Sequence, residues 1–188
     1  MGKKILLVDN EDSFTLNIRD YLRQTGAQVS VLPFGQAYMR DDWKNYDALV
    51  LGPGPGNPEY MPDLLEFTRM AMVQMPVLGI CLGFQAIAFA LGARIGRKEP
   101  RHGKTDSVKI VRRGPLFRDI PDNFIVVRYH SLVVEELEKP LITNLLTEKG
   151  ELMGFEHESM NICGFQFHPE AHLSEYGLQL LKNWTGSF

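Results

Sequence analysis

The first half of the chain alternates short apolar runs with longer segments whose apolar residues recur every three or four positions. Phe14, Ile18 and Leu22 fall on one face of a predicted helix. Asp12 or Ser13 is placed to cap that helix. The same patterns predict strands over Lys4–Val8, Val29–Leu32, Asp47–Leu51 and Pro76–Ile80, and helices over Pro62–Val73 and Leu82–Leu91. Such alternation favours an α/β fold with an open, mostly parallel twisted sheet, covered by helices on both faces.

The pattern becomes rich in strands after about residue 104. The candidates are strands over Ser107–Val111, Phe124–Arg128, Leu152–His157 and Ile162–Phe167, and a final helix from about Ser174 to Trp184. The sequence contains no internal repeat, low-complexity segment or linker. With 188 residues in total, we expect residues 1–188 to form a single α/β domain with a β-rich second half.

Composition excludes several classes of partner. The net charge is −3 and no cluster of Lys and Arg stands out, which argues against a nucleic-acid or anionic membrane surface. No apolar run approaches the roughly 18 residues that a membrane-spanning helix needs, and no signal peptide is recognisable. The two cysteines are too few for a disulfide scaffold. We therefore expect a cytoplasmic protein with reduced thiols.

One of those cysteines occupies an unusual position. Cys81 lies between Gly79 and Gly83, where a predicted strand turns into a predicted helix. A side chain at such a turn projects above the sheet, and its neighbours two positions away must be small. The start of the helix favours an anion, so a thiolate would be stabilised there. We predict that Cys81 is a nucleophile, although a buried structural cysteine is the alternative; for Cys163, inside an apolar strand, the structural role is expected.

A nucleophilic cysteine needs a base and a group that orients the base. His168 and Glu170 follow the apolar strand that ends near Phe167, with Pro169 between them. Active sites of open α/β sheets gather at the carboxyl ends of strands, so these side chains are expected at the same edge as Cys81. The alternative is a surface loop with an incidental ion pair.

A third motif, LGPGPGNPE at residues 51–59, also follows an apolar strand. Its prolines stiffen the loop, and its glycines allow close approach of the backbone to a ligand. The N–H of Gly54, together with that of Leu82, could stabilise an oxyanion. A plain turn remains the alternative. No dinucleotide fingerprint or phosphate-binding loop is present, and the histidines are too dispersed to predict a metal site.

Taken together, these motifs resemble class I glutamine amidotransferases, which have a flavodoxin-like fold. The resemblance covers essentially the whole chain. Three further segments are similar to one branch of that family: DNEDSFT at 9–15, HGKT at 102–105 and RYHSL at 128–132. That branch is the small subunit of the synthases that aminate chorismate to make anthranilate or 4-amino-4-deoxychorismate.

The resemblance implies a role for each matched residue. Cys81 would be the nucleophile, His168 the base and Glu170 the residue that orients it. Gly54 and Leu82 would supply the oxyanion N–H groups. The glutamine substrate would be held by Gly54, Pro55, Gly56, Gln85, Ser131 and Leu132. No metal or organic cofactor is implied, and the partner would be a chorismate-binding large subunit in a hetero-oligomer.

The chain departs from that branch after the triad, where HPEAH replaces the usual HPESI. Ala171 removes a hydroxyl and His172 replaces an apolar residue, which affects the surroundings of the site or a contact with the partner. Two other function classes stay open: a stand-alone γ-glutamyl hydrolase or peptidase, and a catalytically idle flavodoxin-like binding protein. Of the two possible products we favour aminodeoxychorismate, because the chain is short, but one small subunit can serve both synthases.

Overall fold

The computed structural model describes residues 2–188, with the side chains of Arg101 and His102 left out. Within these residues the strands form one sheet in the order β2-β1-β3-β4-β9-β8-β7-β5-β6. The strands are β1 Lys4–Asp9, β2 Gln28–Pro33, β3 Ala48–Leu51, β4 Val77–Ile80, β5 Ile95–Ile110, β6 Asn123–Val134, β7 Leu141–Thr147, β8 Leu152–His157 and β9 Ile162–Phe165. The helices are α1 Thr15–Gln24, α2 Phe34–Tyr38, α3 Pro62–Gln74, α4 Leu82–Ala90 and α5 Gly177–Thr185, with 3₁₀ turns at Asp42–Asn45, Pro58–Tyr60 and Pro115–Phe117.

The sheet has a parallel half and an antiparallel half. Strands β2, β1, β3, β4 and β9 pair in parallel, and β9, β8, β7, β5 and β6 pair antiparallel. Every residue of β3 and β4 is buried, as their uninterrupted apolar sequences predict for strands covered on both faces. The predicted α/β fold with a β-rich second half is confirmed.

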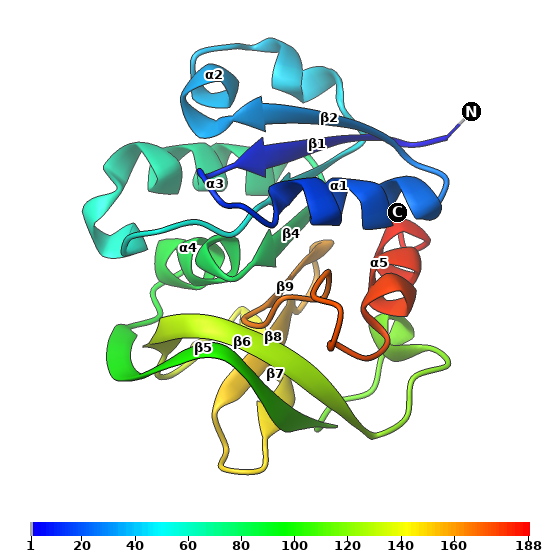
Figure 1. The fold of residues 1–188 in the computed structure, drawn as a ribbon. Coiled ribbons are helices and arrows are strands. Elements are labelled where there is room, and N and C mark those ends of the chain that lie inside the picture. Colours follow the sequence, from blue (N-terminus) through cyan, green and yellow to red (C-terminus); the bar gives the residue numbers. More distant parts are fainter. Residues whose placement is uncertain (1) are drawn as a thin grey trace.

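Two apolar cores lie on opposite faces of the parallel strands. In β1, Ile5 and Leu7 point into one core, while Leu6 and Val8 point into the other. Because successive strand residues face opposite sides, both faces of β1 are apolar. Helices α1 and α5 cover the first core, and α2, α3 and α4 cover the second. Figure 1 shows α1 beside α5 and, across the sheet, α3 beside α4.

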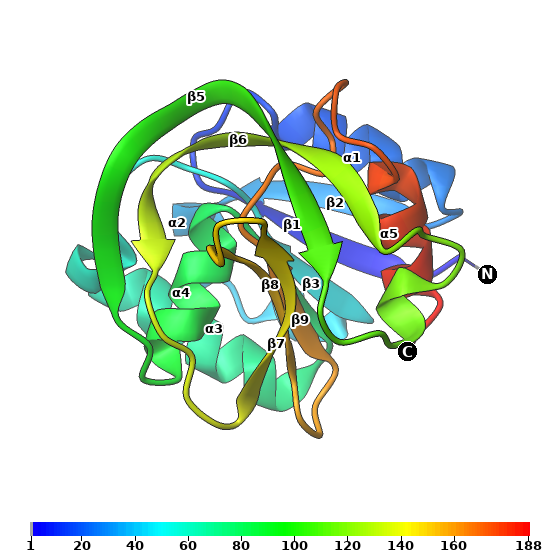
Figure 2. The ribbon, with the colours of Figure 1, turned by 90° about the horizontal axis from the view of Figure 1, so that it is seen from below.

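The antiparallel half is larger than the sequence predicts. Strands β5 and β6 form a long curved pair that arches over the end of the parallel sheet, as Figure 2 shows. The pairing of β5 with β6 shifts register between Arg97 and Arg101 and again between His102 and Lys104. Pro100 and a left-handed Gly103, both inside β5, hide this strand from the hydrophobic pattern. Strand β7 and the short α2 were not predicted.

Two helix starts also differ from the prediction. Helix α1 begins at Thr15, and the Asp12 carboxylate accepts the N–H of Phe14 in the preceding turn rather than capping the helix. Helix α5 begins at Gly177 instead of near Ser174. The Ser174 hydroxyl bridges the Val127 N–H and the His168 carbonyl, so this residue is committed to the loop after β9.

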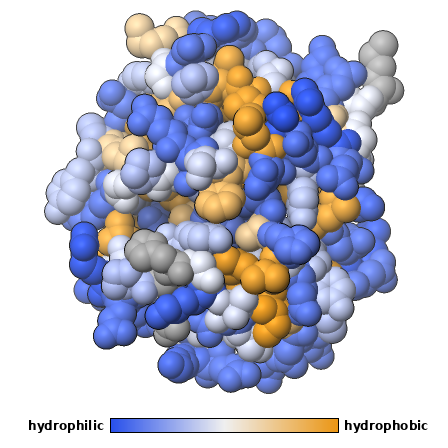
Figure 3. Space-filling view, viewed as in Figure 1, coloured by the Kyte–Doolittle hydropathy of each residue, from blue (hydrophilic) through white to orange (hydrophobic). Residues whose placement is uncertain are grey.

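The surface seen in Figure 3 is mostly polar, with apolar side chains in small separate groups. Among the described residues, no helix combines the length and the apolar character that crossing a membrane requires.

Candidate functional site

Cys81 lies at the turn between β4 and α4, with backbone angles of φ 53° and ψ −101°. A positive φ is unfavourable for a residue with a Cβ, so the surrounding fold must hold this turn. The flanking glycines make the turn possible, because a Cβ at Gly79 would meet the backbone of Gly83 and one at Gly83 would meet the carbonyl of Leu51. The predicted strand-to-helix turn at Cys81 is confirmed. The strained conformation is a common mark of functional positions.

His168 and Glu170 come together beyond the end of β9. The Nδ1 of His168 lies 2.6 Å from Oε1 of Glu170, and both residues are almost fully buried. The backbone of His168 is fixed from two sides: its N–H donates to the Val127 carbonyl at 3.0 Å, and its carbonyl accepts from the Ser174 hydroxyl at 2.6 Å. The imidazole is therefore held by β6 and by the loop before α5.

The electrostatics of His168 are set by its two polar neighbours. Burial lowers the pKa of this imidazole, but hydrogen bonds and negative charge from Cys81 and Glu170 outweigh that effect and raise the pKa to about 10. The protonated form is stabilised when both partners carry negative charge. The site therefore combines a buried carboxylate in contact with an imidazole and a thiol whose influence on that imidazole raises its pKa.

Two aromatic rings pack against the His168 imidazole. The ring centroid of Tyr129, on β6, lies 5.1 Å from that of His168, and the ring centroid of Phe14, just before α1, lies 5.5 Å from it. Both contacts are edge-on, a favoured geometry for aromatic pairs. Neither residue was assigned a place in the site from the sequence, although both lie in segments that carry the family resemblance.

The glycine loop packs tightly against the end of β1. A Cβ at Gly52 would lie 2.7 Å from the Val8 carbonyl oxygen, and one at Gly54 would lie 2.6 Å from the Cβ of Asn10. That position is also 3.0 Å from the Leu82 side chain, so Gly54 and the start of α4 are neighbours. The Asn10 side-chain amide donates to the Gly52 carbonyl at 2.9 Å and fixes the loop. No local pattern in the sequence predicts this role for Asn10.

The next residues of the loop, Pro55 and Gly56, are exposed. Gly56 has a φ of +100°, a backbone conformation that glycine adopts at little steric cost.

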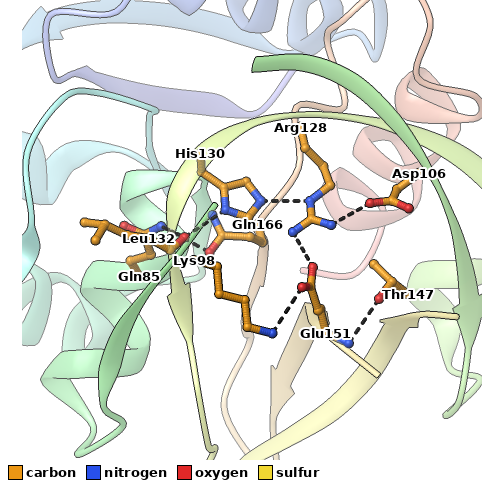
Figure 4. Close-up of polar contacts among 9 residues, drawn as sticks. All are labelled: Gln85, Lys98, Asp106, Arg128, His130, Leu132, Thr147, Glu151 and Gln166. Atoms are coloured by element: carbon orange, nitrogen blue, oxygen red, sulfur yellow. Dashed lines mark hydrogen bonds and ion pairs between the residues drawn. The ribbon is translucent and has the colours of Figure 1, made fainter. Parts of the chain in front are cut away.

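Gln85, on α4, meets β6 and the end of β9. Its Nε2 donates to the Leu132 carbonyl and to Oε1 of Gln166, both at 3.1 Å, as Figure 4 shows. The structure thus brings Gln85 and Leu132 together, as expected for two residues of one site. Ser131, beside Leu132, is half-buried. Gln166 was missed, because a glutamine within an apolar strand carries no signal beyond its polarity.

The remaining candidates divide into buried and exposed residues. Burial raises the pKa of the Cys163 thiol far above its usual range, so this cysteine stays protonated and inert.

Ala171 is buried and its N–H donates to the His168 carbonyl at 3.2 Å, whereas His172 is exposed. Ala171 therefore belongs to the turn that carries His168 and Glu170, which favours the expected effect on the surroundings of the site over a contact with the partner. The side chain of His102 lies outside the described residues.

A cavity of about 660 Å³ at the amino ends of β1 and β2 is lined by Lys4, Arg23 and Gln28 among others. Cys81 and His168 lie beyond the carboxyl ends of β4 and β9, at the opposite edge of the parallel strands. This cavity is therefore separate from the candidate site. Within the part of the chain that the structure describes, no group of three or more His, Cys, Asp and Glu residues is placed to hold a metal ion.

Curated relatives cover nearly the whole chain. An aminodeoxychorismate synthase of Streptomyces griseus is 43% identical over 185 residues, which are 96% of this chain but 25% of that protein. The anthranilate synthase component 2, pyocyanine specific, of Pseudomonas aeruginosa is 41% identical over 98% of this chain and 95% of its own length. The anthranilate synthase component 2 of Mycobacterium tuberculosis is 38% identical over 96% of this chain and 81% of its own length.

Solved structures share the fold. A Thermoplasma acidophilum protein described as a putative GMP synthase subunit superposes with a TM-score of 0.87 at 27% identity, over 99% of this chain and 94% of that one. A glutamine amidotransferase from Thermotoga maritima, at 23% identity, has a TM-score of 0.79 over 100% of this chain and 82% of that chain. Residues 6–186 match the model of the family described as glutamine amidotransferase class-I. The chain is therefore a member of the class-I glutamine amidotransferase family.

Proposed function

We propose that this chain hydrolyses glutamine through Cys81, His168 and Glu170, and passes the ammonia to a synthase that aminates chorismate. The observation that carries the proposal is the pairing of a strained Cys81 turn with an imidazole held 2.6 Å from a buried carboxylate. In this proposal the sulfur is the nucleophile, the imidazole is the base and the carboxylate is the group that orients the base.

In the first half of the reaction, the Cys81 thiolate attacks the side-chain amide carbon of glutamine. Negative charge then develops on the amide oxygen, where the N–H groups of Gly54 and Leu82 would stabilise it. The protonated His168 gives its proton to the departing nitrogen as the C–N bond breaks. Ammonia leaves, and a γ-glutamyl thioester on Cys81 remains.

In the second half, His168 is neutral and can accept a proton from water as the water attacks the thioester carbon. The C–S bond breaks, glutamate leaves and the Cys81 thiolate is restored. Throughout, the buried Glu170 would hold the imidazole with Nδ1 toward itself and stabilise its charged form.

Glutamine is proposed to lie between the glycine loop and β6. The backbone of Gly54, Pro55 and Gly56 would form one wall, and Gln85 with the backbone of Ser131 and Leu132 the other. The hydrogen bond between Gln85 and Leu132 supports this grouping, because it joins two elements that are far apart in the sequence.

The proposed partner rests on the relatives. Two of the three named above are called anthranilate synthase component 2, and the third aminodeoxychorismate synthase. We propose that the partner is a chorismate-binding large subunit, with aminodeoxychorismate synthase slightly favoured over anthranilate synthase. A single chain that served both would agree with the same similarities.

Alkylation and reconstitution test the proposal. Iodoacetamide should label Cys81, and glutamine should protect it. Mixed with chorismate and each candidate large subunit, the chain should then release glutamate and support synthesis from glutamine. Rapid glutamate release that no synthase alters would instead indicate a stand-alone γ-glutamyl hydrolase. Alkylation that glutamine does not affect would indicate a binding protein without this activity.

A further inference from the structure

A buried arginine lies on β6, four residues before Leu132 of the proposed glutamine-binding wall. Arg128 is 1% exposed, and its guanidinium has three partners. Nη1 lies 2.6 Å from Asp106, Nη2 lies 2.5 Å from Glu151, and Nε donates to Nε2 of His130 at 3.2 Å. Lys98 also contacts Glu151, at 3.1 Å. A buried guanidinium with its charge balanced in this way is held firmly in one orientation.

That orientation decides which nitrogen of His130 carries the proton. An arginine Nε can only donate, so Nε2 of His130 must accept. The ring proton therefore sits on Nδ1, which donates to the Leu132 carbonyl at 2.8 Å. Burial, and then the charge of Arg128, lower the pKa of His130 to about 4. The imidazole is thus neutral near pH 7, with a single tautomer.

The Leu132 carbonyl passes this constraint on to Gln85. It accepts from His130 on one side and from Nε2 of Gln85 on the other, at 2.8 and 3.1 Å. The second proton of Gln85 goes to Oε1 of Gln166 at 3.1 Å. Both amide protons are committed to the protein, so Oε1 is the atom of Gln85 left to accept a hydrogen bond from a ligand. In Figure 4 the four residues Arg128, His130, Leu132 and Gln85 form one continuous chain of contacts.

We propose that Arg128 and His130 are positioning residues for the substrate. They fix the Leu132 carbonyl and the side-chain amide of Gln85, so that the acceptor Oε1 of Gln85 meets an N–H group of the glutamine substrate. The proposal rests on the proposed function of the site. It explains why a charged side chain is buried in a strand, where an apolar residue of similar volume would be at least as stable. Neither residue touches the reacting atoms.

The alternative is that the cluster only ties the antiparallel strands together. Asp106 lies on β5, Arg128 on β6, and Glu151 just before β8, so their ion pairs do link several strands. A purely structural cluster would change stability without a selective effect on glutamine binding. The split between KM and kcat separates the two roles.

The first test reads the wild-type protein without using activity. Nitrogen NMR of ¹⁵N-histidine-labelled protein should show His130 neutral, with the proton on Nδ1, at about pH 6. Charged groups near this ring are Arg128 and Glu151, and His168 lies close enough to interact with it. A doubly protonated ring, or one with the proton on Nε2, at that pH would overturn the proposal. This result does not depend on whether the chain hydrolyses glutamine.

The second test compares two variants of His130, assayed with the large subunit present. His130→Leu removes the donor to Leu132, whereas His130→Asn keeps an N–H close to the position of Nδ1. We expect His130→Leu to raise the KM for glutamine about tenfold, with kcat changed less than about threefold. His130→Asn should recover most of the loss. Equal effects of the two variants, or a fall in kcat alone, would refute a positioning role.

The third test removes the charge that orients His130. Arg128→Met keeps most of the volume, and Arg112→Met is the matched control, because Arg112 is half-exposed and pairs with Glu156 at 3.3 Å. Only Arg128→Met should raise the KM for glutamine. Iodoacetamide should alkylate Cys81 at the wild-type rate in both variants. If Arg128→Met does not fold, the NMR measurement and the comparison of His130→Leu with His130→Asn still test the positioning role. A wild-type protein with the predicted tautomer but no glutamine hydrolysis would refute the proposed function alone.

Discussion

The Nδ1 of His168 lies 2.6 Å from Oε1 of Glu170, although only Pro169 separates the two residues in the chain. The Glu170 carboxylate occupies Nδ1, and its hydrogen bond and negative charge contribute to the raised pKa of the imidazole. Both side chains are almost fully buried, so water cannot compete for the contact. The short HPE segment thus fixes the orientation of the imidazole that we propose as the base.

Replacing Cys81 by serine should abolish glutamine hydrolysis, with a loss of at least about 10³-fold, because the hydroxyl is a far weaker nucleophile here. The partner synthase should still work with added ammonium salt. Cys163→Ser is the control, since that thiol is buried in β9. Glutamate release and ammonium-dependent synthesis are measured for each variant. A folded Cys163→Ser protein that is equally inactive would reverse the assignment of the two cysteines.

The base and the orienting group should differ in their effects. His168→Asn removes the group that transfers protons, and we expect a loss of about 10³-fold or more in kcat. Glu170→Gln keeps a hydrogen-bonding side chain beside Nδ1, so its loss should be smaller. Steady-state kinetics at saturating glutamine give both values. A Glu170→Gln variant slower than His168→Asn would contradict this division of roles.

Much of the candidate site could be predicted because glycine and proline mark the strand ends that carry it. Gly79 and Gly83 flank Cys81, and a Cβ at Gly79 would meet the backbone of Gly83 only four residues away; Pro169 separates His168 from Glu170 beyond the end of β9. Burial of β3 and β4 on both faces likewise follows from their uninterrupted apolar sequences. In each case the signal lies within a few residues of the feature.

The parts that were missed depend on contacts between distant segments. Arg128 and His130 look like polar positions on an exposed strand face, yet both are buried, because Asp106 and Glu151 come from other strands to balance the charge. Strand β7 contains a fully buried Asn144, which interrupts its apolar pattern. Neither the ion pairs nor this burial can be read from a local window of sequence.

The fit of the glycine loop gives a further prediction. In Gly54→Ala the new Cβ would collide with Asn10, so the loop should shift and the proposed oxyanion N–H should leave its position. We expect kcat to fall about 10²-fold or more, by analogy with the loss of one oxyanion donor. Gly35→Ala is the control, because a Cβ there meets nothing within 4 Å. Equal activity of the two variants would exclude Gly54 from the site.

The neutral state of His130 should make stability depend on pH. Its pKa is about 4 in the fold, against an ordinary value of 6.5, so the unfolded chain binds the proton more readily. Stability from this residue is complete above about pH 6.5 and is lost as the pH falls toward 4, by up to about 3 kcal/mol. Urea unfolding of wild type and His130→Asn over this range measures the difference. Parallel pH curves for the two proteins would contradict the prediction.

Activation by a partner is a prediction that follows from the fate of ammonia. Most free ammonia is protonated near neutral pH and is then no longer a nucleophile, so hydrolysis without a synthase would waste glutamine. A small movement of a loop changes such a reaction strongly, since about 1 Å of misplacement can cost about 10²-fold. We expect weak glutamate release from the chain alone, rising at least several-fold with a chorismate-binding large subunit, and further with chorismate. Full activity without any partner would contradict this.

The docking surface for that partner can be tested beside the triad. His172 and Leu173 are exposed directly after Ala171, and Gly103 and Lys104 are exposed on β5. Leu173→Asp should weaken activation by the large subunit while leaving the basal rate unchanged, because an exposed apolar side chain at an interface would be replaced by a charge. Val73→Asp is the matched control: Val73 is also exposed, but it lies at the end of α3, away from the triad edge. Titration of each variant with the large subunit measures the effect, and equal activation of both would place the docking surface elsewhere.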